Sequence, residues 1–300
     1  MVNVKKISTE QRNQNTINID VVSTREMLTL INNEDKTVPL AVEKAIPQIE
    51  KVVEVATETI KHGGRVIYIG AGTSGRLGVL DASECPPTFS VSDNVFVGII
   101  AGGDKALRKS SEGTEDEKES AINDLKQFGL TKNDFLIGIA ASGRTPYSIA
   151  AIEYANQLGC NTGCITTSQN SPISEVAKYP IEAITGAEPI TGSTRMKSGT
   201  AQKLILNMIS TATMIKLGKV YENLMIDVKM SNEKLISRGI GFVMTATNCD
   251  YEKAKEYIEK FGSAKLATYS ILSGVEDEET IKKILDANDN NLRKALKNRI

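Results

Sequence analysis

The chain has 300 residues, of which 40% are hydrophobic and 24% are charged, and its formal net charge at pH 7 is −1. This composition is typical of a globular protein with room for one large domain and a smaller one. Because the net charge is close to zero, it gives no electrostatic case for a nucleic-acid partner or an anionic membrane.

The first 18 residues are polar and mixed in charge, so they do not resemble a secretion signal. No apolar run approaches the roughly 20 residues that a membrane-spanning helix needs. We therefore expect a cytoplasmic protein with no membrane partner. The chain has one histidine, His62. A histidine-rich metal site is thus excluded, and a Ser-His-Asp triad would have to use His62, which we instead expect to end a helix.

Helical spacing of apolar residues predicts one helix over residues 20–33 and a second over 42–61, with room for a kink at Pro47. Five short apolar runs rich in β-branched residues follow and predict buried strands. The runs are 66–69, 95–100, 135–140, 162–166 and 181–184. Longer stretches between them, 106–128 and 146–158, predict crossover helices. This alternation predicts an α/β fold, a doubly wound parallel sheet in a three-layer αβα arrangement.

The last third of the chain carries helical patterns in place of the alternating strands and helices. Residues 195–217 predict a long helix, and from residue 231 onward only helical periodicity remains. Residues 248–250 form a predicted N-cap region, and Gly274 is a predicted helix stop. We therefore expect a small C-terminal helical bundle over 231–300. The other expected parts are an N-terminal helical segment over 1–50, packing on the core or on a partner subunit, and an α/β domain over 51–230.

A glycine-rich turn directly follows the first predicted strand. Gly70, Gly72 and Gly75 satisfy the G-x-G-x-x-G pattern of a dinucleotide site. That site needs a regular helix after the third glycine, and Pro86 and Pro87 are expected to interrupt it. An acidic residue after the second strand is available in Asp104, so the NAD-binding alternative stays open.

The same turn carries two hydroxyl side chains, Thr73 and Ser74, beside Gly72. Backbone N–H groups and hydroxyls at the start of a helix suit a single phosphate better than a pyrophosphate. The alternative is a tight turn selected only for its backbone geometry. Phosphate binding and this structural alternative are equally compatible with the turn alone.

A second loop of similar composition follows the third predicted strand and contains Ser142, Gly143, Arg144 and Thr145. Thr145 and the proline after it also suit an ordinary capped helix start. However, ligands of open α/β sheets bind at the carboxyl ends of the strands. Two hydroxyl-rich loops at that edge favour a phosphorylated small molecule.

A third segment opens the long helix and holds Ser193, Thr194, Arg195 and Lys197. Hydroxyls and cations at a helix N-terminus suit an anion, although the same residues also suit helix capping with solvated charges.

Two positions supply candidate carboxylates. Glu84 lies among small and apolar residues in the predicted loop over 81–87, where partial burial would raise its pKa. A solvated loop acid is the competing interpretation. Glu115 lies in an acidic run over 112–119, and such runs are usually solvated faces. Spacing alone does not select Glu115 from the run.

Four segments, 70–78, 81–87, 140–147 and 191–203, closely resemble the N-acetylmuramic acid 6-phosphate etherases, and the likeness covers nearly the whole chain. The resemblance implies a sugar isomerase (SIS) fold, with the phosphosugar-binding domain over 51–230, a homodimer, and no cofactor or metal. It implies cleavage of the lactyl ether of N-acetylmuramic acid 6-phosphate to N-acetylglucosamine 6-phosphate and D-lactate, in cell-wall sugar recycling. By motif, Glu84 and Glu115 are the implied catalytic glutamates.

Elimination across C2 and C3 of the open-chain sugar needs a base for the C2 proton and an acid for the departing lactate oxygen. Two carboxyl groups in different environments can hold opposite protonation states. Our hypothesis is that Glu84 is the acid and Glu115 the base. Two alternatives remain: a phosphosugar isomerase on the same fold, which also needs a base near C2, and a non-catalytic regulator that senses sugar phosphates.

Overall fold

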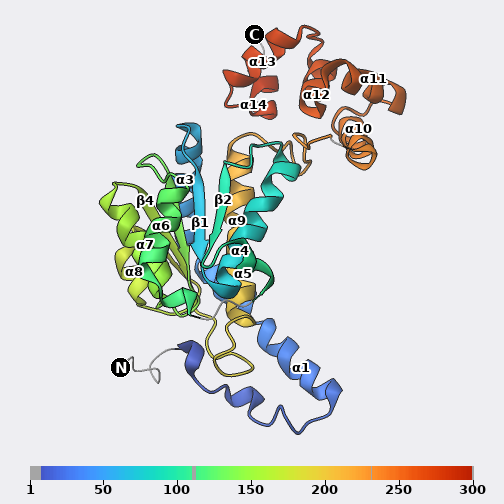
Figure 1. Ribbon diagram of the computed structural model, residues 1–300. Helices are drawn as coiled ribbons and strands as arrows, with labels where there is room; N and C mark the ends of the chain where they lie inside the picture. Colours follow the sequence, from blue (N-terminus) through green and yellow to red (C-terminus); the bar gives the residue numbers. More distant parts are fainter. Residues whose placement is uncertain (1–7, 110–112, 231, 299–300) are drawn as a thin grey trace. The chain divides into compact units, whose positions relative to one another are not determined.

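The computed structural model describes residues 8–109, 113–230 and 232–298 (Figure 1). The chain divides into two compact units. The first unit comprises Met1–Ser83 and Asn94–Ser210, and the second comprises Glu84–Asp93 and Thr211–Ile300. Among the described residues, no helix combines the length and apolar character that a membrane crossing requires.

The first unit is built on a five-stranded parallel sheet in the order β2-β1-β3-β4-β5. The strands are β1 (Val66–Gly70), β2 (Phe96–Ile100), β3 (Phe135–Ile139), β4 (Asn161–Thr166) and β5 (Tyr179–Glu182). The chain leaves β1 for one neighbour, β2, and then crosses to the other neighbour, β3. The topological switch point therefore lies between β1 and β3, and ligands of such sheets bind beyond the carboxyl ends of the strands there. The predicted doubly wound sheet is confirmed, although β5 begins two residues earlier than predicted.

Helices cover both faces of the sheet (Figure 1). Ile67 and Ile69 of β1 are fully buried in a core cluster that includes residues of α6 (Lys118–Gln127) and α7 (Pro146–Gln157). The alternate residue, Tyr68, faces α4 (Gly72–Phe89), where a Cβ on Gly78 would lie 3.0 Å from the Tyr68 Cβ. Because side chains alternate along a strand, the sheet buries both faces, which explains its nearly continuous apolar strands.

The helix predicted over 42–61 is divided in the structure into α2 (Val38–Lys44) and α3 (Ile46–Lys61). Pro47 lies in the first turn of α3. Its ring lacks an N–H and clashes with the carbonyl of the preceding turn, so a new helix starts there. The preceding helix, predicted over 20–33, is α1 (Thr24–Asp35), which the Ser23 side chain caps.

The prediction of one helix over 106–128 is wrong. The structure has α5 (Asp104–Arg108), the single-turn helix η4 (Thr114–Asp116) and α6. Gly113 has φ +82°, in the left-handed region, and Glu117 is extended, so neither can continue an α-helix. The connection between β2 and β3 is therefore not one continuous helix, and Glu115 lies in the single-turn helix η4.

The prediction that Pro86 and Pro87 interrupt the helix is also wrong, because both lie inside α4. They occupy its last turn, and because proline has no backbone N–H, the helix lacks only two hydrogen bonds close to its end. The backbone N–H of Ser90 still donates to the Pro86 carbonyl over 3.0 Å. The prolines therefore give no argument against a dinucleotide site.

Two further helices are α8 (Pro172–Val176) and α9 (Lys197–Lys216), the long helix predicted over 195–217. The first unit includes α8 and the residues of α9 up to Ser210. The second unit has its own buried cluster, which includes Ile240, Ile258 and Tyr269. Its helices are α10 (Glu233–Thr247), α11 (Tyr251–Phe261), α12 (Ala264–Ser273), α13 (Glu278–Asp286) and α14 (Leu292–Lys297). The predicted C-terminal helical bundle is confirmed, and within the predicted N-cap region 248–250 it is the Asp250 side chain that caps α11.

Candidate functional site

The glycine-rich turn after β1 is tightly packed and leads directly into α4. A Cβ on Gly75 would lie 2.5 Å from the Gly70 carbonyl oxygen, so no side chain fits there. Gly72 adopts φ +53° at the first position of α4. The first N–H groups of a helix have no intrahelical acceptors and lie at the positive end of its dipole. The turn therefore presents Gly72, Thr73 and Ser74 as donors to an anion.

A cavity of about 180 Å³ lies at this helix start, beyond the carboxyl ends of β1 and β3. It is the switch point at which the sheet topology predicts a ligand. Predicted site residues that line it are Gly72, Thr73, Ser74, Ser142, Thr145, Thr194 and Glu115; Glu10, Ala71, Ala141 and Gly192 complete the lining. The structure thus brings together hydroxyls from all three predicted segments.

The first two segments reach the cavity by different means. Thr73 is held against α9, because a Cβ on Gly199 would be 3.4 Å from the Thr73 Cγ2. Thr145 occupies the N-cap position of α7, but its side chain makes no capping hydrogen bond and lines the cavity instead. The expected capping role is therefore not what the structure shows, and the hydroxyl is available to a ligand.

The structure selects Glu115 from the acidic run. Arg76 of α4 donates to the carbonyl oxygens of Ala106 (2.7 Å) and Leu107 (3.2 Å), which ties the end of α5 to the helix that carries the glycine turn. The next described residues enter η4, where Glu115 lines the cavity and Asp116 and Glu117 do not. Glu112 lies outside the described residues.

Glu84 is not among the residues that line the cavity. It lies on α4, twelve positions beyond Gly72, and its side chain is exposed. At about 1.5 Å of rise per residue, the helix separates the two positions by roughly 18 Å. Of the two interpretations, the structure supports the solvated acid and not the partly buried one, although this segment is helical and not a loop, and Glu84 faces outward.

Two further predicted residues of the second loop lie outside this cavity. Gly143 is buried with φ +65°, and a Cβ there would lie 2.2 Å from the Ser171 Oγ, so its role is to let the loop fold closely. Arg144 is exposed and lines a neighbouring polar cavity of about 240 Å³ together with Ser142, Ser168 and Ser171. Ser142 is common to both cavities.

The N-terminus of α9 already holds an anion of the chain itself. The buried Glu188 carboxylate accepts from the backbone N–H groups of Lys197 (2.8 Å) and Ser198 (2.9 Å) and from the Ser198 hydroxyl (2.7 Å). This internal cap fills the place where the sequence suggested a phosphate. Ser193 and Arg195, from the same segment, do not line the cavity.

Lys197 is likewise engaged within the protein. Its Nζ lies 2.7 Å from Glu34 Oε2, and both side chains are buried. Burial by itself raises the pKa of Glu34, but hydrogen bonds from Lys197 and Asn15 outweigh burial and hold that pKa below its ordinary value. The predicted ligand role of Lys197 is thus replaced in this structure by a buried ion pair that fixes the start of α9.

Sequence reasoning missed Glu10, which lines the cavity from the 3-10 helix η2 (Ser8–Glu10). The segment is anchored further along: Asn13 Nδ2 donates to the Ala187 carbonyl over 3.3 Å and Thr16 Oγ1 donates to the Pro189 carbonyl over 2.7 Å. No spacing or composition signal could have found Glu10, because these contacts join residues more than 170 positions apart in the sequence.

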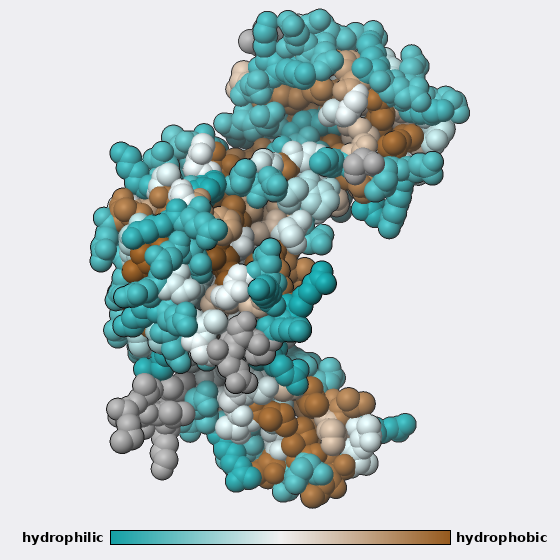
Figure 2. All heavy atoms as spheres, in the orientation of Figure 1, coloured by the Kyte–Doolittle hydropathy of each residue, from teal (hydrophilic) through white to brown (hydrophobic). Residues whose placement is uncertain are grey.

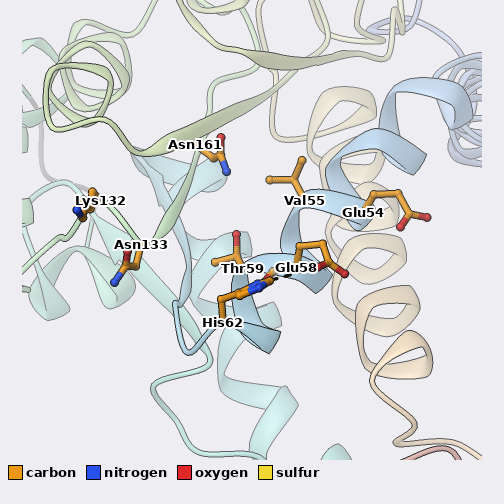
Figure 3. Close-up of a pocket in the computed structure, with 8 residues that line it drawn as sticks. All are labelled: Glu54, Val55, Glu58, Thr59, His62, Lys132, Asn133 and Asn161. Carbon is orange, nitrogen blue, oxygen red and sulfur yellow. Dashed lines mark hydrogen bonds and ion pairs between the residues drawn. The ribbon is translucent and has the colours of Figure 1, made fainter. Parts of the chain in front are cut away.

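A larger cavity of about 390 Å³ lies elsewhere, lined in part by Glu58 of α3, by His62 at the C-cap of that helix, and by Lys132 and Asn161 (Figure 3). Asn161 is the first residue of β4, so this cavity is at the amino ends of the strands. His62 Nδ1 lies 2.7 Å from the Glu58 carbonyl, which fits the structural role at a helix end that the sequence predicted. Ligands of parallel sheets bind at the opposite edge, and the 180 Å³ cavity is therefore the candidate site.

Within the described ranges, no group of three or more His, Cys, Asp or Glu side chains has the arrangement of a metal site. Two family models match the chain: "Glucokinase regulatory protein N-terminal SIS domain" over residues 48–156 and "SIS domain" over residues 119–212. Solved structures share the fold. A protein of Escherichia coli, solved with a bound ligand, has TM-score 0.50 and 18% identity, over 67% of this chain and 97% of that one. A phosphoheptose isomerase from Francisella tularensis has TM-score 0.50 and 16% identity, over 65% and 100%.

Curated relatives match over nearly the full length. An N-acetylmuramic acid 6-phosphate etherase of Clostridium beijerinckii is 54% identical over 98% of this chain and 97% of its own. Proteins with that name from Bacillus cereus and, as etherase 2, from Vibrio cholerae are 53% and 51% identical, over 95% and 96% of this chain and 97% and 94% of their own. The SIS fold, the cavity at the switch point and this identity agree, and the chain belongs to the family of N-acetylmuramic acid 6-phosphate etherases.

Proposed function

We propose that this protein cleaves the D-lactyl ether of N-acetylmuramic acid 6-phosphate, giving N-acetylglucosamine 6-phosphate and D-lactate. The observation that carries the proposal is the shared cavity, in which Glu115 lies with the hydroxyl-bearing turn Gly72–Thr73–Ser74 and with Ser142. Phosphate-binding groups and a carboxylate on one small cavity are what an enzyme acting on a phosphosugar requires. The names of the relatives support this etherase activity, and we place the reaction in amino-sugar recycling.

The phosphate binds at the start of α4. The backbone N–H groups of the first turn and the hydroxyls of Thr73 and Ser142 donate to its oxygens, and the helix dipole favours its charge. The Ser74 hydroxyl, which donates to Gln202 in this structure, donates to the phosphate when the Gln202 amide is reversed. A phosphate fixed there is remote from the reacting carbons, so its binding energy orients the sugar. Thr194, which lines the cavity, and Arg144, Ser193 and Arg195 from the adjoining loops are further candidates for contacts with the substrate, whereas Lys197 is held by Glu34.

The chemistry proceeds on the open-chain sugar. The C1 aldehyde acidifies the C2 proton, and Glu115 accepts that proton as general base. The C3–O bond breaks, the C2=C3 double bond forms, and the lactate oxygen takes a proton from a general acid. Water then adds to the unsaturated aldehyde, its hydroxyl to C3 and a proton to C2, which gives N-acetylglucosamine 6-phosphate.

Glu84 is the proposed general acid, but its place on α4 puts it beyond the reach of a sugar whose phosphate is bound at Gly72 of the same chain. The family resemblance implies a homodimer, and in our proposal Glu84 of a second copy of the chain reaches the sugar that the first copy binds. An apolar patch around α1 supports self-association (Figure 2). Val21 and Leu28 in that region are 77% and 61% exposed, which is costly for side chains left in water.

The cytoplasmic location, the absence of a cofactor and the three-part division into residues 1–50, 51–230 and 231–300 are parts of the same proposal. Within it, the N-terminal segment contacts the core or the partner subunit, and the C-terminal helices form a separate domain.

The deciding experiment is incubation of the purified protein with N-acetylmuramic acid 6-phosphate and enzymatic measurement of D-lactate. Stoichiometric lactate and N-acetylglucosamine 6-phosphate are expected. Folded protein that binds the substrate without releasing lactate contradicts the etherase and favours the regulator. Conversion of an aldose phosphate to a ketose phosphate instead identifies an isomerase, and NAD binding in calorimetry identifies the dinucleotide alternative.

A further inference from the structure

The N-terminal segment carries a carboxylate into the phosphate cavity. Glu10 lines the cavity together with Gly72, Thr73, Ser74 and Glu115, and its side chain is half-buried. Within residues 8–109, 113–230 and 232–298, no hydrogen bond or ion pair holds the Glu10 carboxylate. An anion placed without a protein partner beside a phosphate site raises the phosphate's energy, so its presence there needs a compensating contact.

The position of Glu10 is built by long-range contacts. A Cβ on Gly192 would lie 3.1 Å from Glu10 Oε2, closer than an ordinary contact, so the carboxylate lies directly against the backbone at that point. Gly192 has φ +76°, in the left-handed region that glycine adopts readily. The missing side chain of Gly192 thus leaves the space that the carboxylate needs.

The segment behind Glu10 is fixed by hydrogen bonds to a rigid part of the first unit. Asn13 and Thr16 donate to the carbonyl oxygens of Ala187 and Pro189, on either side of Glu188, which caps α9. Asn15 Nδ2 donates to Glu34 Oε1 over 2.7 Å, and Glu34 pairs with Lys197 of α9. Glu10 is therefore presented to the cavity by a network that continues into the same helix against which Thr73 packs.

We propose that Glu10 is a specificity-determining residue whose carboxylate accepts a hydrogen bond from the sugar hydroxyl nearest the phosphate. The inference deepens the proposed function and rests on it. In a ring-form hexosamine 6-phosphate the C5 oxygen is part of the ring, so that hydroxyl is on C4, between the phosphate-bearing end and the lactyl-bearing C3. The contact therefore acts on binding of the ring form, before the ring opens for the elimination. Glu10 lines the cavity together with the phosphate-binding turn Gly72–Thr73–Ser74, so the donor within its reach is a hydroxyl close to the phosphate, and in the ring form this is the hydroxyl on C4.

When a sugar hydroxyl donates a hydrogen bond to the Glu10 carboxylate, that bond offsets the electrostatic repulsion between the carboxylate and the phosphate. A ligand without a donor at that place keeps the repulsion and gains nothing. Glu10 consequently favours the gluco configuration at C4, because the galacto epimer carries its hydroxyl on the opposite face of the ring. Charge-assisted hydrogen bonds of this kind account for about tenfold or more in affinity.

The test compares Glu10→Gln with wild type and with Glu26→Gln, an exposed acid in the first turn of α1. Calorimetry measures the Kd of N-acetylglucosamine 6-phosphate, of its C4 epimer N-acetylgalactosamine 6-phosphate, and of inorganic phosphate. The two sugars carry the same charge, so the repulsion cancels in their ratio. In Glu10→Gln the preference for the gluco epimer is expected to fall about tenfold, while inorganic phosphate binds at least as tightly as before. Glu26→Gln is expected to keep the wild-type preference.

An unchanged epimer preference in Glu10→Gln overturns the inference. Equal weakening of all three ligands, with a lower melting temperature, also overturns it, because that pattern belongs to a residue that only stabilises the segment. None of the three probes contains the lactyl ether. A failure of the proposed function is seen separately, as absence of lactate release by the wild-type protein.

Discussion

The hydroxyl of Ser74 donates a hydrogen bond to Gln202 Oε1 over 3.0 Å, and both side chains are buried. Gln202 Nε2 is buried and has no partner within the described residues. A hydroxyl has one proton, so Ser74 cannot donate to Gln202 and to a phosphate at once. If the Gln202 amide is reversed, Nε2 donates to the Ser74 oxygen and the hydroxyl proton turns to the cavity. The oxygen and nitrogen of an amide are assigned from such networks.

A double-mutant cycle tests whether Gln202 acts through Ser74. We expect Ser74→Ala to weaken binding of inorganic phosphate about tenfold and Gln202→Leu to weaken it by a smaller factor, because the freed hydroxyl is no longer oriented. The double variant is expected to bind like Ser74→Ala alone, measured by calorimetry. Fully additive losses would mean that Gln202 contributes to the site independently of Ser74.

Glu115 is predicted to be the base. Replacement by Gln keeps the shape of the side chain but removes its ability to accept a proton, so turnover is expected to fall roughly a hundredfold to ten-thousandfold. Affinity for N-acetylglucosamine 6-phosphate, measured by calorimetry, should change little. Glu117→Gln is the matched control, since Glu117 is also exposed, lies two positions away and does not line the cavity. Loss of lactate release in the Glu117 variant, with activity kept in the Glu115 variant, would reassign the base.

The origin of the acid is predicted to be a second copy of the chain. Glu84→Gln and Glu115→Gln proteins are each expected to be inactive. Mixing them under conditions that exchange subunits should restore about one quarter of wild-type lactate release, because half of the dimers are mixed and each mixed dimer has one intact site. If the mixture stays as inactive as its components although mixed dimers form, both glutamates act within one chain.

A comparison of Gly143 with Gly129 separates backbone strain at positive φ from steric clash of an added side chain. Both have φ +65°, but a Cβ on Gly143 meets Ser171 Oγ at 2.2 Å, whereas a Cβ on Gly129 meets nothing within 4 Å. Alanine at Gly129 is expected to lower the free energy of unfolding by about 1–2 kcal/mol. Alanine at Gly143 is expected to lower the free energy of unfolding by roughly 1–3 kcal/mol more than alanine at Gly129 does. It should also weaken phosphate binding, because it displaces the loop that holds Ser142. Urea unfolding measures the free energy of unfolding of both variants. Equal decreases in the two variants would show that the loop around Gly143 relaxes to accommodate the new methyl group.

Asp134 is predicted to make stability depend on pH. It is buried, and it accepts from Arg65 Nη2 over 2.8 Å and from the Thr131 N–H over 2.9 Å. Burial by itself raises the pKa of Asp134, but hydrogen bonds from Arg65 and Thr131 outweigh burial and hold the pKa below its ordinary value. Since the folded pKa is depressed, this stabilisation is present above the unfolded pKa and is lost as the pH falls through the folded one.

At pH 7 we expect Asp134→Asn to lower the free energy of unfolding by about 3 kcal/mol, because Arg65 loses its partner. The difference from wild type should narrow as the pH falls below about 4, where the wild-type carboxyl takes up a proton. The control is Asp20→Asn at an exposed site. A difference that is constant from pH 7 to pH 3 would assign the loss to packing and not to charge.

The sequence by itself determined the strands, the hydroxyl-rich turns after β1 and β3, the helical C-terminus and the family. These depend on local pattern: apolar runs, glycine at positive φ, and residues next to each other in one turn. It misjudged α4 and the connection over 106–128, where the position of Pro86 within the last turn and the dihedral angle of Gly113 decided the outcome.

Only the tertiary structure decided which residues meet at the cavity. In the folded chain, Glu115 is the residue of the acidic run that lines the cavity, and Glu188 binds the N–H groups at the start of α9. Lys197 pairs with Glu34, and Glu10 lies beside Gly192. Each of these is a contact between segments distant in sequence. A carboxylate has the same local signature whether it caps a helix, pairs with a lysine or faces a ligand. The difference arises from what the folded chain places within about 3 Å of its oxygens.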